Sequence, residues 1–211
     1  MGECPTSTRQ LVSDDWETKL RRLTVLATLC VLFVTLRTAH AQQFDAALGF
    51  GSLTAPSAGR TGAPSLGGGL YPSFSADYLI KHNVGVQGEV SWRASQNSYF
   101  GLPYRPIFFD FNGIWAPRLG KKAQAELMAG IGSEDVRIYG TINCGFTGCT
   151  NYTSTTHFAG HFGGGIRYYV WHNVFVRPEA HYYAIHNNNE FNTSHAARFA
   201  ISIGYSFRPG F

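Results

Sequence analysis

Residues 195–207 read HAARFAISIGYSF, and this stretch decides the fold. Its odd positions, from Ala197 to Phe207, carry apolar residues, whereas its even positions, from Ala196 to Ser206, carry small, polar or charged ones. An alternation of period two is typical of a β-strand with one apolar and one polar environment on its two faces. We therefore expect an amphipathic strand here, and we interpret Phe207 and the terminal Phe211 as aromatic closers of the chain.

The same alternation recurs along the chain. We expect strands at residues 44–52, 66–80, 84–94, 104–116, 122–136, 154–170, 174–185 and 195–207. Long connections (52–65, 95–103, 137–153 and 186–194) alternate with short ones (81–83, 117–121 and 171–173). An even strand count with this asymmetry predicts an all-β fold, an eight-stranded antiparallel up-and-down transmembrane β-barrel. Pro72, Pro106 and Pro178 fall inside predicted strands, where we expect bulges or strand ends.

The two faces of the strands differ in charge. The interior of an eight-stranded barrel is filled by side chains and has no room for many aromatic rings, so a water-soluble barrel with its apolar face inside is disfavoured. The residues predicted to face lipid are Phe109, Phe111, Trp115, Phe199, Ile201, Ile203 and Tyr205. The residues predicted to form a polar network in the lumen are Glu89, Arg93, Asp110, Glu126, Arg167, Arg177, Glu179 and Arg198.

The N-terminus has the pattern of a secretory signal. Basic residues at positions 19, 21 and 22 precede an apolar run at 23–36, and Ala39-His40-Ala41 follows as a small-residue cleavage motif. The apolar run is shorter than the roughly 20 residues of a spanning helix. We expect a signal peptide at 1–41, cleaved after Ala41, and a barrel domain at 42–211. The segment before the apolar run is unusually long for a signal peptide and contains the acidic residues Asp14, Asp15 and Glu17. The alternative is therefore an uncleaved amphipathic anchor or a misassigned start codon.

Composition limits the partners and the chemistry. Residues 42–211 hold 12 basic and 9 acidic residues, a balance that predicts no nucleic-acid partner. Cys144 and Cys149, spaced as CGFTGC, form an even pair in an exported chain, which predicts a disulfide. Two thiolates without histidines at ligand spacing do not complete a zinc site, so no metal site is predicted.

Residues 43–211 resemble the small eight-stranded outer-membrane family typified by the OmpA transmembrane domain and OmpX. The features that carry the resemblance are the leader, the eight amphipathic strands and the segment GGGIRYYVWHNVFVRPEAHYY at 163–183. It implies a bacterial outer-membrane location, with outer-membrane lipids and the barrel-assembly machinery as partners and no cofactor. The chain stops within four residues of the last strand, so we expect no periplasmic domain.

These features predict a structural or cell-surface interaction role, with the lumen plugged by its charged network. Loops such as CGFTGCTNYTSTT and HNNNEFNTS have the composition of adaptable contact surfaces, which suggests a surface ligand. One alternative is a small, porin-like pore of low conductance. A second alternative is a lipid A-modifying enzyme, whose histidine and serine would have to face the lipid. Two observations disfavour it: His157, His161 and His181 face inward by parity, and Ser194-His195 has only Glu190 as a nearby acid. No catalytic or cofactor-binding residues are predicted.

Overall fold

The computed structural model describes residues 43–56, 65–81, 83–145 and 148–207. The predicted signal peptide, its cleavage after Ala41 and the closing aromatic Phe211 lie outside the described residues. Among the residues that the structure describes, no helix is long and apolar enough to cross a membrane.

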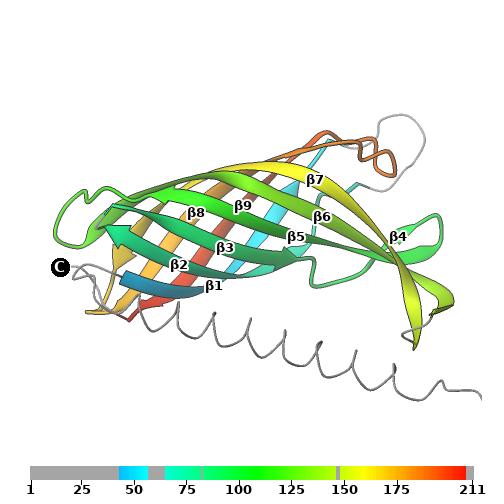
Figure 1. Ribbon diagram of the computed structural model, residues 1–211, viewed down its shortest axis with the longest axis horizontal. Helices are drawn as coiled ribbons and strands as arrows, with labels where there is room; N and C mark the ends of the chain where they lie inside the picture. Colours follow the sequence, from blue (N-terminus) through cyan, green and yellow to red (C-terminus); the bar gives the residue numbers. More distant parts are fainter. Residues whose placement is uncertain (1–42, 57–64, 82, 146–147, 208–211) are drawn as a thin grey trace, which may run out of the picture. The chain divides into compact units, whose positions relative to one another are not determined.

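The described residues form one antiparallel sheet, whose strands cross the barrel obliquely (Figure 1). Its strands are β1 (Gln43–Thr54), β2 (Leu70–Lys81), β3 (Val84–Trp92), β4 (Asn97–Tyr99), β5 (Leu102–Trp115), β6 (Ala123–Gly145), β7 (Gly148–Tyr169), β8 (Val174–Ile185) and β9 (His195–Ser206). The order is β3-β2-β1-β9-β8-β7-β6-β5-β4, and pairing of β3 with β5 closes the cylinder. β4 pairs only with β5, so eight strands make the wall. The predicted eight-stranded up-and-down barrel is confirmed.

The hairpin of β6 and β7 is much longer than predicted. Its ladder continues through Tyr139↔Tyr152 to Cys144↔Cys149, so most of the predicted loop at 137–153 is strand. A disulfide joins Cys144 and Cys149 near the tip, as predicted. The alternation of apolar residues fails here because both faces of the hairpin are wet, while β-branched residues such as those of TNYTSTT still favour strand. We call residues 139–145 and 148–152 the ribbon, and Figure 1 shows it reaching past the ends of the neighbouring strands.

Two further differences have local causes. β2 begins at Leu70 and not at residue 66, because Gly68 and Gly69 adopt φ angles of 81° and 85°, which break an extended strand. The prolines cause no bulge in the register of β2, β5 or β8. Pro72 and Pro106 lie one residue beyond an end of the β2–β3 and β3–β5 ladders, and Pro178 lies at an interruption of the β7–β8 ladder.

Exposure alternates along the strands as the pleat requires. The seven side chains predicted to face lipid all lie on the outer wall, each with 44–61% of its surface exposed. Inside, three layers follow one another along the barrel. Near the short turns, two small apolar clusters (Leu79, Ile114, Ala116 and Met128; Ala47, Tyr169 and Phe175) lie among the buried polar side chains of Gln43, Gln124 and Ser206. Charged residues occupy the middle, and a larger apolar cluster lies near the long loops.

Candidate functional site

The middle layer is built around three fully buried arginines. Arg167 on β7 forms ion pairs with Asp45, with Asp77 at 2.8 Å and with Glu126. These three carboxylates come from β1, β2 and β6, so one guanidinium connects strands on opposite sides of the cylinder. Such a contact can form only when the barrel has closed.

Arg177 on β8 shares two of these acids. Its Nη1 lies 3.0 Å from Asp77 Oδ2 and 2.7 Å from Glu126 Oε1, and its Nε lies 2.6 Å from Glu179 Oε2. Its Nη2 donates to Ser75 Oγ at 2.9 Å. Because all of these groups are buried, the ion pairs are poorly screened. Arg167 and Arg177 each compensate three carboxylates.

Arg198 on β9 begins a chain of hydrogen bonds that fixes the state of two histidines. Its Nη2 donates to Glu89 and to His181 Nε2, the latter at 3.0 Å. Because a guanidinium only donates, His181 carries its proton on Nδ1 and donates to His161 Nε2 at 3.0 Å. His161 then carries its proton on Nδ1 and donates to Asn112 Oδ1 at 2.7 Å. The pattern therefore assigns a neutral imidazole to both residues.

Acids exceed bases in this layer. It holds three arginines and the six carboxyl groups of Asp45, Asp77, Glu89, Asp110, Glu126 and Glu179. Of the eight residues predicted for the lumen network, Arg93 lies apart from the others. It is buried near the long loops and donates to Tyr104 Oη at 3.3 Å. His161 and His181, which were predicted to face inward, lie in this layer. The eight residues predicted for the network did not include Asp45, Asp77 or Asn112, although the parity of their strands already pointed these side chains inward.

The three residues Glu89, Glu179 and His181 have ligand atoms within 4.8 Å of one another, an arrangement that suits a cation. Arg198 already contacts both Glu89 and His181 Nε2 with its Nη2. A metal ion would have to displace this guanidinium from the same acceptors. Two guanidinium groups thus already occupy these acceptors, Arg198 at Glu89 and His181 and Arg177 at Glu179.

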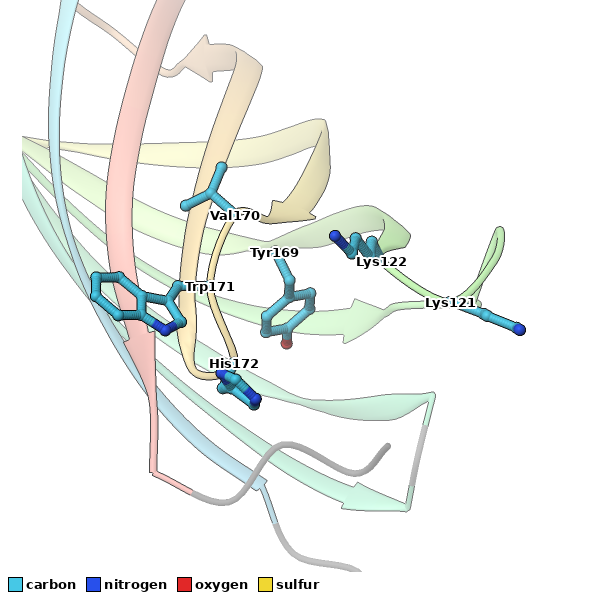
Figure 2. A pocket seen from close by; sticks show the side chains of 6 residues that line it. All are labelled: Lys121, Lys122, Tyr169, Val170, Trp171 and His172. Carbon is cyan, nitrogen blue, oxygen red and sulfur yellow. The ribbon is translucent and has the colours of Figure 1, made fainter.

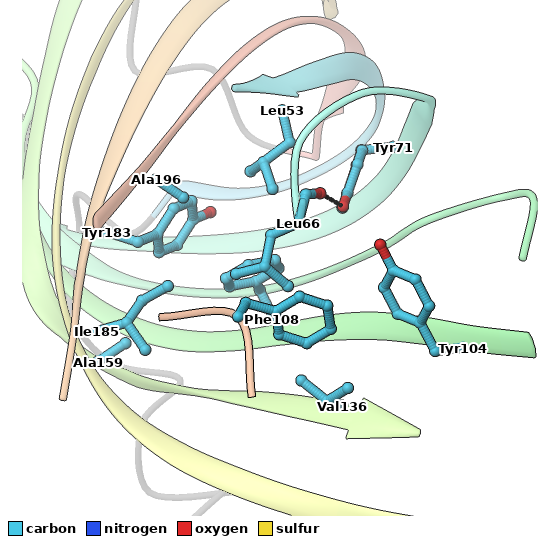
Figure 3. Packing of buried hydrophobic residues seen from close by; sticks show 11 residues of the cluster. Leu53, Leu66, Tyr71, Tyr104, Phe108, Val136, Ala159, Tyr183, Ile185 and Ala196 are labelled. Carbon is cyan, nitrogen blue, oxygen red and sulfur yellow. Dashed lines mark hydrogen bonds between the residues drawn. The ribbon is translucent and has the colours of Figure 1, made fainter. Parts of the chain in front are cut away.

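A large apolar cluster lies inside the barrel at the end of the long loops (Figure 3). Leu66, from the β1–β2 connection, and Phe191, from the β8–β9 connection, are both fully buried. The ring of Phe191 lies 5.0 Å from that of Tyr104, and Tyr71 donates to the carbonyl of Leu66 at 2.7 Å. Phe108 and Tyr183 pack against each other across the barrel, with ring centroids 4.8 Å apart and tilted ring planes. Two loops thus contribute side chains to the interior.

Polar contacts fix the β8–β9 connection over this cluster. Asn188 donates to Glu134 Oε2 at 2.6 Å and accepts from the backbone N–H of Phe191 at 3.1 Å. Glu190 lies 3.0 Å from His157 Nε2. These contacts orient the segment so that Phe191 points into the barrel mouth.

Glu134 is the titratable group of this contact. Its outward neighbours on β6, Asp135 and Arg137, are polar and pair with each other at 3.1 Å, so Glu134 lies beyond the apolar part of the wall. Burial raises the pKa of the Glu134 carboxyl to about 8, and the nearby carboxylates of Glu190 and Asp135 raise this pKa further, against the hydrogen bond from Asn188.

The histidines do not form a catalytic arrangement with Ser194. His161 and His181 are inside the barrel, and Glu190 pairs with His157. Ser194 Oγ lies 3.3 Å from His195 Nδ1, and both residues are exposed at the rim. The acid predicted for this pair, Glu190, contacts His157 and not His195. These contacts therefore do not join Ser194, His195 and Glu190 into the nucleophile, base and acid that the enzyme hypothesis requires.

A closed cylinder with an apolar outer wall and a polar interior defines an integral outer-membrane β-barrel protein. Residues 26–207 match the family model of the outer membrane protein beta-barrel domain, and the chain belongs to this family. It is located in the bacterial outer membrane. No curated protein sequence matches the chain.

Solved barrels are similar in fold. Neisserial surface protein A is 13% identical, with a TM-score of 0.55 over 78% of this chain and 96% of that one. Ail, the attachment invasion locus protein of Yersinia pestis, solved with the heparin analogue sucrose octasulfate, is 12% identical, with a TM-score of 0.54 over 79% and 99%. A major outer membrane protein of Thermus thermophilus is 11% identical, with a TM-score of 0.54 over 80% and 100%. At these identities the likeness concerns the fold alone.

Proposed function

We propose that this protein is a plugged barrel that acts at the cell surface through its long-loop end. The mature protein begins after Ala41, and residues 42–211 form the barrel domain, which the barrel-assembly machinery inserts. Long loops of outer-membrane barrels face outward and short turns face the periplasm, which puts the ribbon outside the cell. The observation that carries the proposal is this ribbon, which extends a disulfide-linked hairpin past the wall.

The plug rests on the three layers inside the barrel. A conducting path would have to pass the apolar clusters at both ends and the charged layer between them, in which Arg167, Arg177 and Arg198 are fully buried. A narrow apolar constriction excludes hydrated ions. The layers therefore favour a closed barrel over the alternative of a low-conductance pore.

Refolded protein in planar bilayers should give no discrete channels, and well-defined openings would favour the pore. A chemical test locates the seal. Ser91 is fully buried below the Leu66–Phe191 cluster, whereas Ser98 on β4 is exposed. The variant S91C should resist a water-soluble thiol reagent and become reactive when Leu66 and Phe191 are both replaced by alanine. S98C should react in both backgrounds. Rapid labelling of S91C with the seal intact would contradict the plug.

Surface interaction is supported by the unpaired side of β7. The β7–β8 register begins at Ala159, so residues 150–156 of β7 pair with β6 alone. They read TNYTSTT, without the lysine or proline that usually blocks an exposed edge. Such an edge can add an extended strand of a protein partner. The charged side chains at its base, Asp135 and Arg137, pair with each other, so a polyanion like the one bound to Ail is not favoured.

The test compares adhesion of bacteria that display two forms of the protein. In one variant an Asn-Gly turn joins Ile138 directly to Thr153, which removes the ribbon and keeps the wall. Bacteria displaying the intact protein should adhere to protein-coated surfaces and to cultured cells, and those displaying the variant should not. The variant must still migrate as a folded barrel in unboiled gels. Equal adhesion with equal surface display would refute the role of the ribbon.

A further inference from the structure

The short-turn end of the barrel has a charge of one sign. The three connections read KHN at 81–83, PRLGKK at 117–122 and WHN at 171–173, and none of them contains Asp or Glu. Arg118, Lys121, Lys122 and His172 are exposed there. In contrast, the long-loop end mixes both signs, as in the pair of Asp135 with Arg137.

Two of these turns form a cavity of about 400 Å³. It is lined by Lys121, Lys122, Tyr169, Val170, Trp171 and His172 (Figure 2). The backbone N–H of Tyr169 donates to the carbonyl of Lys122 at 2.8 Å, which fixes the two turns side by side. Figure 2 shows Tyr169 between Lys122 on one side and Trp171 and His172 on the other. The cavity is therefore lined by two lysines, a histidine and two aromatic residues. In Figure 2, Lys122 lies nearer Tyr169, and the side chain of Lys121 extends away from it.

The cavity continues into the apolar outer wall. Trp171 is 73% exposed and Val170 is 54% exposed, and Tyr168 and Ile166 continue the same outward face along β7. Leu127 on β6 lies beside this face, because Leu127 pairs with Gly164 and its neighbour Ala125 pairs with Ile166. A ligand in the cavity could thus place a polar group among the basic side chains and a hydrocarbon chain on the wall.

We propose that this cavity binds the headgroup of an anionic glycerophospholipid from the leaflet at the short-turn end. The phosphodiester lies between Lys122 and His172, the exposed side chain of Lys121 turns toward it from the rim, and one acyl chain follows Val170 and Tyr168 along the outer wall. Opposite charge accounts for the headgroup, because lysines near a membrane surface attract anionic lipids. The aromatic side chains suit the boundary between headgroups and hydrocarbon. Neither half of the cavity alone would select a lipid over a soluble anion.

The test measures lipid retention by the intact barrel. Purified protein is equilibrated with equal amounts of phosphatidylglycerol and phosphatidylcholine of identical acyl chains, and bound lipid is counted by native mass spectrometry. We expect one phosphatidylglycerol to be retained at least fivefold over phosphatidylcholine. The variant K121Q/K122Q should lose this preference. The control R118Q/R137Q has the same change in net charge but alters no residue that lines the cavity, and it should keep the preference.

Three results would overturn the proposal: equal retention of both lipids by the wild type, equal loss in both double variants, or displacement of the lipid by millimolar glycerol phosphate. The last would assign the cavity to a soluble phosphate ester. Because Lys121 and Lys122 are exposed turn residues, unboiled gels should show normal folding of the variant. The result is independent of adhesion through the ribbon, which lies at the other end of the barrel.

Discussion

Replacing Arg177 with methionine removes one of three positive charges from the middle layer and keeps most of the side-chain volume. The fully buried guanidinium contacts Asp77, Glu126 and Glu179 at 2.6–3.0 Å, and it donates to Ser75 at 2.9 Å. The variant would leave these carboxylates facing one another in a layer where acids already outnumber arginines. The barrel cannot relieve the repulsion by exposing them, because they come from three different strands of a closed wall.

Removing one partner of a buried ion pair costs about 3–5 kcal/mol, chiefly because the remaining charge is left uncompensated. This corresponds to a roughly 200- to 5,000-fold change in the unfolding equilibrium. Arg137 gives the matched control. It pairs with Asp135 at 3.1 Å, but 33% of its side chain is exposed, so R137M should cost about 0–1 kcal/mol.

The free energy of unfolding is measured by urea titration in lipid vesicles, with tryptophan fluorescence and gel mobility as independent readouts. The double variant R177M/E179Q removes both members of one pair, and its cost should be smaller than the sum of the single costs by about 0.5–3 kcal/mol. A cost for R177M no greater than that for R137M would refute the reasoning, and so would strict additivity with E179Q. Either result would mean that the middle layer is hydrated.

Three further changes test other parts of the barrel. G204A should cost about 1–3 kcal/mol, because its methyl group would lie 2.2 Å from the buried ring of Phe175; an unchanged melting temperature in unboiled gels would contradict this. I201R places a charge on the outer wall at a position 59% exposed and should cost about 2–4 kcal/mol; the readout is folding yield in vesicles, which a water-facing wall would leave unchanged. The raised pKa of Glu134, about 8, means that its contribution to holding the β8–β9 connection in place is complete below the ordinary glutamate pKa of 4.5 and is lost as the pH rises through 8. Amide exchange of residues 186–194, corrected for intrinsic rates, should therefore increase between pH 5 and pH 9 in the wild type and not in E134Q.

The strands of the barrel wall could be predicted from the sequence, because the alternation of apolar and polar residues alone decides which face of a strand each side chain occupies. Arg198 and Phe199 are adjacent in the chain, and the structure puts the first inside and the second outside. In a strand with different environments on its two faces, a shift of one residue would reverse every side chain, so the pattern fixes the face. The predicted strand count followed from the same pattern and was confirmed by the closed sheet.

The ribbon could not be predicted in the same way. Tyr139 and Tyr152 pair across it, but both faces of this part of the hairpin meet water, and the alternation of apolar and polar residues therefore disappears. What remains is the strand propensity of TNYTSTT and the spacing of Cys144 and Cys149. The cysteines predicted the disulfide, but a disulfide fits a loop as well as a hairpin, so it did not reveal the strands.

The details of the lumen depend on register. His161 is opposite Tyr183, and His181 is opposite Gly163, so the two imidazoles are diagonal neighbours on β7 and β8. Their 3.0 Å contact requires this register, which one sequence does not specify. The same holds for Leu66 and Phe191, since nothing in the apolar pattern distinguishes a loop residue that enters a barrel from one that remains outside. The position of a residue along its strand predicts whether its side chain faces the lumen or the lipid. The residues that this side chain contacts depend on the register of the closed barrel.

The charged layer and the apolar clusters depend on each other. Ion pairs among six carboxyls and three arginines are strong only where water is excluded, because hydration raises the effective dielectric constant. Leu66 and Phe191 exclude water on one side, and Leu79 and Phe175 do so on the other. In return, the arginines connect strands across the cylinder and hold the narrow cross-section that the apolar side chains fill. A barrel that conducted ions through this lumen would have to give up both features, and this mutual dependence supports the plug proposed above.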